Sequence, residues 1–220
     1  MSGLVRSQTG VLNIPEETAN QLTHGVGLLL SLAGAAVLVS SARAHSDPLQ
    51  FAGCCVYAAS LVALYAASTL SHSFRTPRLR HFFRMLDQVC IFLLITGTFT
   101  PFALSYFLQG WLWGLTLTMW TLTCVGIFFK VCFRRWTNVA TGTYVLLGWI
   151  PVIAIHEVVR DMAAGGLVLI AAGGALYMAG LYFFTRDEKV PYYHAVWHVL
   201  VVGASICHYF AVMLYLIPHA

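Results

Sequence analysis

The sequence has few charged residues: Asp, Glu, Lys and Arg together make up 9% of its 220 residues, whereas a soluble domain carries about 25%. So little charge cannot cover a water-facing surface, which excludes a soluble globular protein. Hydrophobic residues make up 59% of the chain, and its length suffices for about seven spans of about 20 residues. We therefore expect an all-α membrane protein, a seven-transmembrane helix bundle that forms a single integral membrane domain over residues 1–220.

Two further features are missing. Residues 1–14 lack the basic segment and apolar core of a cleavable signal peptide, so the first apolar segment is expected to remain as a helix. None of the six cysteines forms a C-x-x-C pair, which favours buried free thiols over disulfides or metal thiolates. Without a soluble basic domain, the net charge of +4 indicates contact with anionic lipid headgroups and not with nucleic acid.

What the chain does contain is a series of long apolar runs separated by charged or Pro- and Gly-rich segments. After a lead-in segment over residues 1–23, these runs predict seven spans, at about 24–42, 49–70, 86–107, 111–129, 139–155, 163–184 and 194–217. Each is close to the length that crosses the hydrocarbon core of a bilayer.

The basic residues predict how these spans are oriented. Ten of the twelve Lys and Arg residues fall in the N-terminal segment and in the second, fourth and sixth loops, and only Arg43 and Arg160 fall on the opposite side. The positive-inside rule then places the N-terminus in the cytoplasm and the C-terminus outside. We therefore expect a multi-pass protein of the cell inner (plasma) membrane.

Two histidine-bearing patterns lie at the cytoplasmic ends of their spans. His194 and His198 are four residues apart, so they share a helix face and can chelate one metal ion; the alternative is that both line the membrane interface. Ser68 and His72 show the same spacing at the end of the second span, where the alternative is that His72 only caps the helix.

Carboxylates lie near the same membrane face. Asp87 begins the third span; a helix N-terminus favours an acid, but a carboxylate entering a lipid-embedded helix usually faces a partner or a wet cavity. Glu17, Asn20 and His24 follow Pro15 and share one helical face. The alternatives for this face are an ordinary amphipathic lead-in or a brace for the site without assigned roles.

Together these clusters match the parts of an open zinc site, in which three protein ligands leave one position for water. We expect His72, His194 and His198 to be the ligands. Asp87 is expected to hold or deprotonate the water, or to accept a ligand N–H. Ser68, one turn deeper, is expected to hydrogen-bond the water, the carboxylate or a substrate carbonyl.

The remaining histidines are not expected to bind the metal. His208 follows His198 by ten residues, roughly 15 Å along a helix, and is expected to be a buried, hydrogen-bonded residue. Four more are expected in loops or at the terminus, in contact with solvent: His45, His81, His156 and His219.

Four segments of the chain resemble a known family. They are ETANQLTHGVG from Glu17, STLSHS from Ser68, MLDQVCIFLLITGTFTP from Met85 and YHAVWHVLVVGASICHY from Tyr193. In this order they resemble the bacterial hemolysin III branch of the progestin and adipoQ receptor superfamily, over nearly the whole chain. The resemblance implies a seven-helix bundle with a cytoplasmic N-terminus and zinc held by three histidines. It also implies a water between the metal and Asp87.

The residues and the resemblance lead to three functional hypotheses. The first is a zinc-dependent, ceramidase-like hydrolase acting on a lipid amide or ester, or a regulator of membrane lipid homeostasis. The second is a non-catalytic receptor or membrane-state sensor whose zinc is structural. The third is a hemolysin or cytolysin, which the composition disfavours because the chain has no surface for the soluble state of a secreted pore-former.

Overall fold

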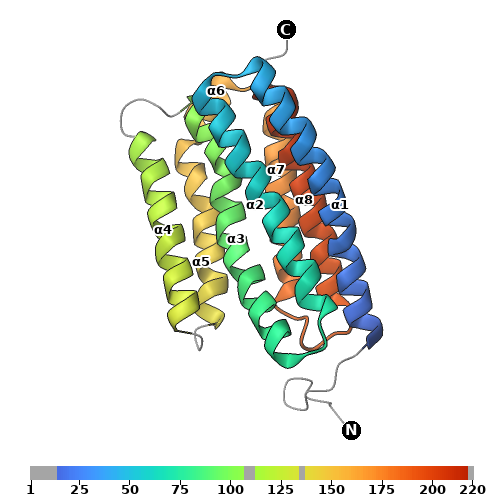
Figure 1. The fold of residues 1–220 in the computed structure, drawn as a ribbon. Coiled ribbons are helices and arrows are strands. Elements are labelled where there is room, and N and C mark those ends of the chain that lie inside the picture. The colour runs from blue at the N-terminus through green and yellow to red at the C-terminus, as the bar shows by residue number, and fades with distance from the viewer. Residues whose placement is uncertain (1–13, 107–111, 134–136, 218–220) are drawn as a thin grey trace.

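The computed structural model describes residues 14–106, 112–133 and 137–217, and these residues form a bundle of α-helices (Figure 1). In chain order the elements are α1 (Ile14–His45), α2 (Pro48–Ser73), α3 (Pro77–Tyr106), α4 (Leu112–Cys132), α5 (Thr137–Trp149), the 3₁₀ segment η1 (Ile150–Ala154), α6 (Ile155–Asp161), α7 (Ala164–Phe184) and α8 (Tyr193–Tyr215). The described residues contain no strand. Seven segments are long and apolar enough to cross a membrane, which confirms the predicted fold class.

The long helices run alternately up and down, so that α1, α3 and α8 begin, and α2 and α7 end, at one end of the bundle, the lower end in Figure 1. Helices suit a lipid environment because each satisfies its own backbone hydrogen bonds where lipid offers no partner. The start of α2 at the upper end is capped by Asp47, whose carboxylate accepts hydrogen bonds from the backbone N–H groups of Leu49 and Gln50 at 2.8 and 3.0 Å. Pro48 occupies the first helical turn, where no N–H is needed.

Two helices begin about two and a half to three turns earlier than the apolar runs that predicted them. The first helix begins at Ile14 instead of near residue 24, and the third begins at Pro77 instead of near residue 86. Hydropathy misses these turns because they carry polar side chains, several of which face other helices and not lipid. The extra turns place Glu17 and Asn20 on α1, and Arg80 on α3, at the lower end of the bundle.

The fifth span is not one continuous α-helix. It consists of α5, η1 and α6, and together these include the membrane-spanning candidate Thr141–Asp161. Pro151 lies at the start of the 3₁₀ segment. It lacks a backbone N–H and its ring clashes with the preceding turn, which explains why the helix tightens there. The predicted span at 139–155 therefore ends about one and a half turns early.

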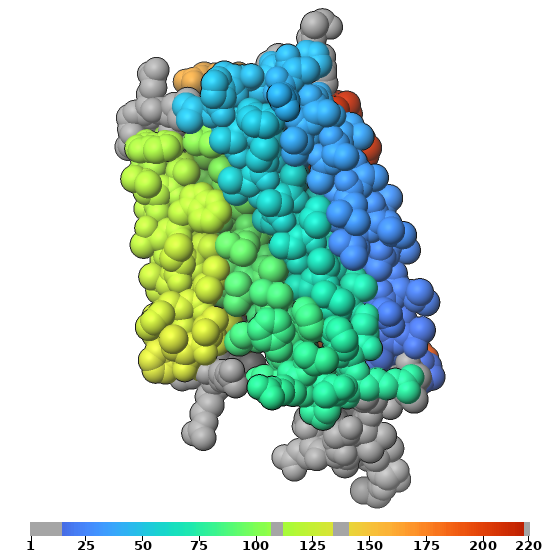
Figure 2. All heavy atoms as spheres, in the orientation of Figure 1, coloured from blue at the N-terminus to red at the C-terminus, as the bar shows by residue number. Residues whose placement is uncertain are grey.

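The outer surface of the bundle is apolar, as lipid contact requires. On α1, Leu22, Val26 and Leu29 are 63%, 55% and 70% exposed. On α5 and α7, Leu146 and Val168 are 62% and 66% exposed. The space-filling view shows α1, α2, α3 and α4 side by side on one face (Figure 2). Such extended exposed apolar surface is expected where lipid replaces water as the solvent.

Candidate metal centre

Three histidines from two helices converge at the lower end of the bundle. His72 lies in the last turn of α2, and His194 and His198 lie in the first two turns of α8. One potential ligand atom from each lies within 4.8 Å of the other two. The ring centroids are 5.2 Å apart for His72–His194, 5.2 Å for His72–His198 and 4.5 Å for His194–His198. This group could hold a metal ion.

Two of these rings are oriented by carboxylates. The Nδ1 atom of His72 lies 2.7 Å from Oε2 of Glu17, and the Nδ1 atom of His194 lies 2.6 Å from Oδ2 of Asp187. An ionised carboxylate can only accept, so each Nδ1 carries the proton and donates it. In the neutral form of each ring, Nε2 is then the nitrogen with the lone pair, which is the form that ligates a metal.

The third ring is oriented by the backbone of α1. The Nδ1 atom of His198 lies 3.2 Å from the carbonyl oxygen of Asn20 and 3.1 Å from the hydroxyl of Thr23. Because the carbonyl can only accept, Nδ1 again carries the proton, and Nε2 is left as the potential ligand atom of the neutral ring. All three rings thus have the outer-nitrogen hydrogen bond that is typical of metal-binding histidines, and the donor set fits a metal ion.

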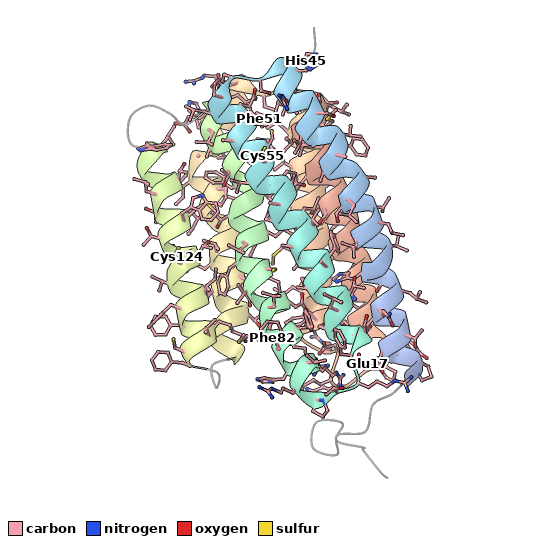
Figure 3. The ribbon with its side chains drawn as sticks, in the orientation of Figure 1. Glu17, His45, Phe51, Cys55, Phe82 and Cys124 are labelled. Carbon is pink, nitrogen blue, oxygen red and sulfur yellow. The ribbon has the colours of Figure 1, made fainter. Side chains whose placement is uncertain are left out.

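Glu17 also links three helices. Its Oε1 atom accepts a hydrogen bond from Arg80 of α3 and lies 3.7 Å from the guanidinium of Arg84, while Oε2 binds His72 of α2. Figure 3 shows Glu17 at the start of α1, at the lower end of the bundle. Two guanidinium groups beside one carboxylate keep it ionised, so it remains an acceptor for the imidazole. The sequence placed Glu17 on the site-facing side of its helix but gave it no role.

A second group of polar side chains lies against the histidines. Asp87 of α3 interacts with the hydroxyl of Ser68 and lies within electrostatic range of His194. Ser68 is fully buried, and its hydroxyl lies 2.6 Å from Nδ1 of His24. The ring of His24 stacks on His198 with centroids 3.5 Å apart. Asp87, Ser68 and His24 are therefore connected side by side next to the candidate metal-binding group.

The structure thus gathers every predicted site residue at one end of the bundle. The predicted set is His72, His194, His198, Asp87, Ser68, Glu17, Asn20 and His24. Sequence reasoning missed Asp187, Thr23 and Arg80. Thr23 could have been found from its spacing, since it lies three residues after Asn20 on the same helix, α1. Asp187 lies in a polar loop, where no helical spacing relates it to the other site residues.

The remaining histidines lie apart from this group. Nε2 of His208 lies 3.3 Å from the carbonyl oxygen of Ile170, and His208 is outside the candidate metal-binding group, as expected. The solvent-exposed histidines were predicted in loops, which is wrong for three of them: His45 ends α1, His81 lies in α3 and His156 lies in α6. Their helices extend past the apolar runs, but all three are exposed. His219 lies outside the described residues.

Comparison with known proteins gives the family. The haemolysin-III related family matches residues 12–209. The chain is 40% identical to Hemolysin-3 of Bacillus cereus, over 94% of each chain. It is 35% identical to the Hemolysin-3 homolog of Bacillus subtilis, over 93% of this chain and 96% of that protein.

A more distant relative comes from animals. The chain is 27% identical to the monocyte to macrophage differentiation factor of Homo sapiens, over 91% of this chain and 84% of that protein. The matches to the bacterial relatives and to the family confirm the resemblance found in the four sequence segments. This multi-pass membrane protein therefore belongs to the haemolysin-III related family.

Proposed function

We propose that this protein is a zinc-dependent hydrolase of the inner (plasma) membrane that cleaves an amide or ester bond of a lipid and thereby regulates membrane lipid homeostasis. One observation carries the proposal. Three converging imidazoles each have Nδ1 bound to an oxygen, so their Nε2 atoms are left as ligands. Three histidines with one position left open are the ligand set of a catalytic zinc ion.

The residues beside this group supply acid–base chemistry. Zinc held by His72, His194 and His198 would polarise a carbonyl and lower the pKa of a bound water from about 15.7 to about 7. Asp87 takes the proton from the attacking water and passes it to the leaving amine or alkoxide. The Ser68 hydroxyl, which contacts Asp87, holds that carboxyl group in position. His24 anchors Ser68 through the 2.6 Å hydrogen bond.

Two buried polar atoms support a polar substrate group next to the metal-binding histidines. Within the described part of the chain, Oδ1 of Asn20 and Nε2 of His24 have no hydrogen-bond partner. Asn20 and His24 are only 4% and 3% exposed, and both contact His198. Buried polar atoms are normally satisfied, and the amide or hydroxyl groups of a lipid headgroup would satisfy them.

The charge distribution supports the cytoplasmic leaflet as the place of reaction. Ten of the twelve basic residues fall in the N-terminal segment and in the segments between the predicted spans on the same side, and the positive-inside rule makes that side cytoplasmic. The metal-binding group lies at the end of the bundle where α1 begins. A lipid could reach it with its headgroup at the interface and its chain among the helices.

The test compares zinc content and lipid hydrolysis in the wild-type protein and Asp87→Asn, both purified in detergent. A panel of fluorescent lipid amides and esters serves as substrate. We expect about one zinc per chain in both proteins and a loss of turnover of at least about 100-fold in Asp87→Asn, because general acid–base catalysis contributes about 10² to 10⁴. The control is Asp161→Asn, which changes an exposed carboxylate at the other end of the bundle and should leave turnover unchanged.

The contrary outcomes separate the alternatives. Full turnover in Asp87→Asn would show that Asp87 does not carry the proton. Stoichiometric zinc without hydrolysis of any lipid in the panel would favour a receptor or sensor with structural zinc. A wild-type protein that binds no zinc would remove the basis of both.

A further inference from the structure

The loop between α7 and α8 contributes a carboxylate to the metal-binding group. Oδ2 of Asp187 lies 2.6 Å from Nδ1 of His194, and the two side chains are 20% and 22% exposed. The other two ligands are better enclosed, since the side chain of His72 is 4% exposed and His198 is 1% exposed. His194 is thus the ligand with the least packing around it, and it depends most on a hydrogen bond for its orientation.

The position of His194 in its helix increases this dependence. The eighth helix begins at Tyr193, so His194 is in the first turn, where backbone N–H groups lack partners within the helix. Tyr192, just before the helix, has a φ of 65°, in the left-handed region, which is sparsely populated by residues other than glycine. Its backbone N–H donates a hydrogen bond to Oε1 of Glu16 at 3.2 Å. This bond to α1 holds the loop where Asp187 reaches His194.

Asp187 does not pair with the cationic side chain next to it. The guanidinium of Arg186 lies 3.9 Å from the ring centroid of Tyr182 and donates a hydrogen bond to the Tyr182 carbonyl at 3.2 Å. Backbone hydrogen bonds from Lys189 and Val190 to the carbonyl of Arg186, at 2.9 and 3.1 Å, fold the loop into a compact turn. The turn directs the carboxylate of Asp187 towards the imidazole.

We propose that Asp187 is a positioning residue of the metal site, which fixes the tautomer and ring orientation of His194 so that its Nε2 atom faces the metal. This inference rests on the proposed function, because it requires a metal at the three histidines. Asp187 acts through His194 and is not itself a ligand, since its oxygen binds the ring nitrogen that does not face the metal.

The test measures zinc affinity by competition with a chelator of known affinity, on purified protein stripped of metal and reloaded. In Asp187→Ala we expect affinity to fall about 10- to 100-fold, the usual effect of removing a hydrogen-bond partner of a metal-bound histidine. Asp187→Asn should recover part of that loss, because its amide oxygen still accepts a hydrogen bond from Nδ1. Glu188→Ala removes the next carboxylate of the same loop, which is exposed, and should bind zinc like the wild type.

A second measurement separates positioning from a structural role. The melting temperature is recorded for each variant without metal and with excess zinc. A positioning role predicts that metal-free Asp187→Ala melts with the wild type and that zinc raises its melting temperature less, because stabilisation by a ligand follows its affinity. A lower melting temperature of the metal-free variant, with an unchanged zinc-induced shift, would overturn the proposal.

The outcomes also separate this inference from the proposed function. If the wild-type protein binds zinc and Asp187→Ala binds it equally well, only the role of Asp187 is overturned. If the wild type binds zinc but hydrolyses no lipid, the proposed hydrolase fails while the role of Asp187 stays testable through affinity. If the wild type binds no zinc, both are overturned.

Discussion

Among the described residues, the polar cluster around Ser205 and the histidine cluster differ in what their polar atoms have left to bind. In the cluster around Ser205, the Tyr65 hydroxyl lies 2.8 Å from the Ser205 hydroxyl, the Tyr177 hydroxyl lies 3.2 Å from it and the Tyr57 hydroxyl lies 3.5 Å from the Ser205 carbonyl. These hydroxyl and carbonyl groups serve as hydrogen-bond partners for one another. In the histidine cluster, the hydrogen bonds that the rings make with described residues use Nδ1, which leaves Nε2 as the second nitrogen of each ring.

The comparison shows that a polar residue within a membrane span does not by itself indicate a site. Intramembrane polar groups are costly and often functional, but neutral hydroxyls can pair with each other and with helix carbonyls at little cost. The Ser205 cluster therefore fits a role in packing α2, α7 and α8. A binding site needs ligand atoms that converge and remain available. One potential ligand atom from each of His72, His194 and His198 lies within 4.8 Å of the other two, and the hydrogen bonds that these rings make with described residues use Nδ1.

The largest expected difference between the clusters is in metal binding. We expect His198→Ala to lower zinc affinity by more than about 100-fold, beyond the effect of losing an outer hydrogen-bond partner, because one of three ligands is removed. His72→Ala and His194→Ala should behave alike. His208→Ala, near the Ser205 cluster, should keep full zinc. The test is the zinc content of each variant after gel filtration in a chelator-buffered solution. An equal loss of zinc from all four variants would contradict a specific metal site at the three histidines.

A smaller effect is expected from the carboxylate that orients His72. Glu17→Gln keeps an oxygen for Nδ1 but loses the charge that pairs with Arg80. We expect zinc affinity to fall by about 10-fold, at the lower end of the range for such partners. Chelator competition measures it, with Glu157→Gln, a partly exposed residue of α6, as the control. Unchanged affinity would mean that Glu17 serves only to hold α1 against α3.

The smallest effect is expected in the Ser205 cluster. Tyr65→Phe removes one hydroxyl but leaves Ser205 with its Tyr177 partner, so no polar group is orphaned. The free energy of unfolding should fall by about 1 kcal/mol, measured by denaturant titration in mixed micelles, and zinc content should stay unchanged. Loss of zinc in this variant would show that the two clusters are coupled and that the distinction drawn between them is wrong.

Much of the site was predictable from helical spacing. The intervals between Ser68 and His72, and between His194 and His198, each place two side chains on one helix face, and the alternation of seven spans brings both pairs to one end. The apolar runs also gave the number of spans. They could not give the early starts of α1 and α3, because polar turns that pack against protein resemble loops in hydropathy.

What the sequence could not give depends on three-dimensional contacts. Asp187 reaches His194 only because the loop turns at Tyr192 with a positive φ and is held by Glu16 of α1. No spacing rule indicates a contact of this kind. The role of Glu17 was missed for the same reason, since its partners His72 and Arg80 come from two other helices.

X-ray absorption at the zinc edge of the purified, zinc-loaded protein tests the central claim most directly. If the three histidines bind one ion through Nε2, the spectrum should show three imidazole nitrogens and one further light atom at about 2.0–2.1 Å. Sulfur at about 2.3 Å, the distance of a cysteine thiolate, or fewer than three imidazoles around the ion, would contradict it.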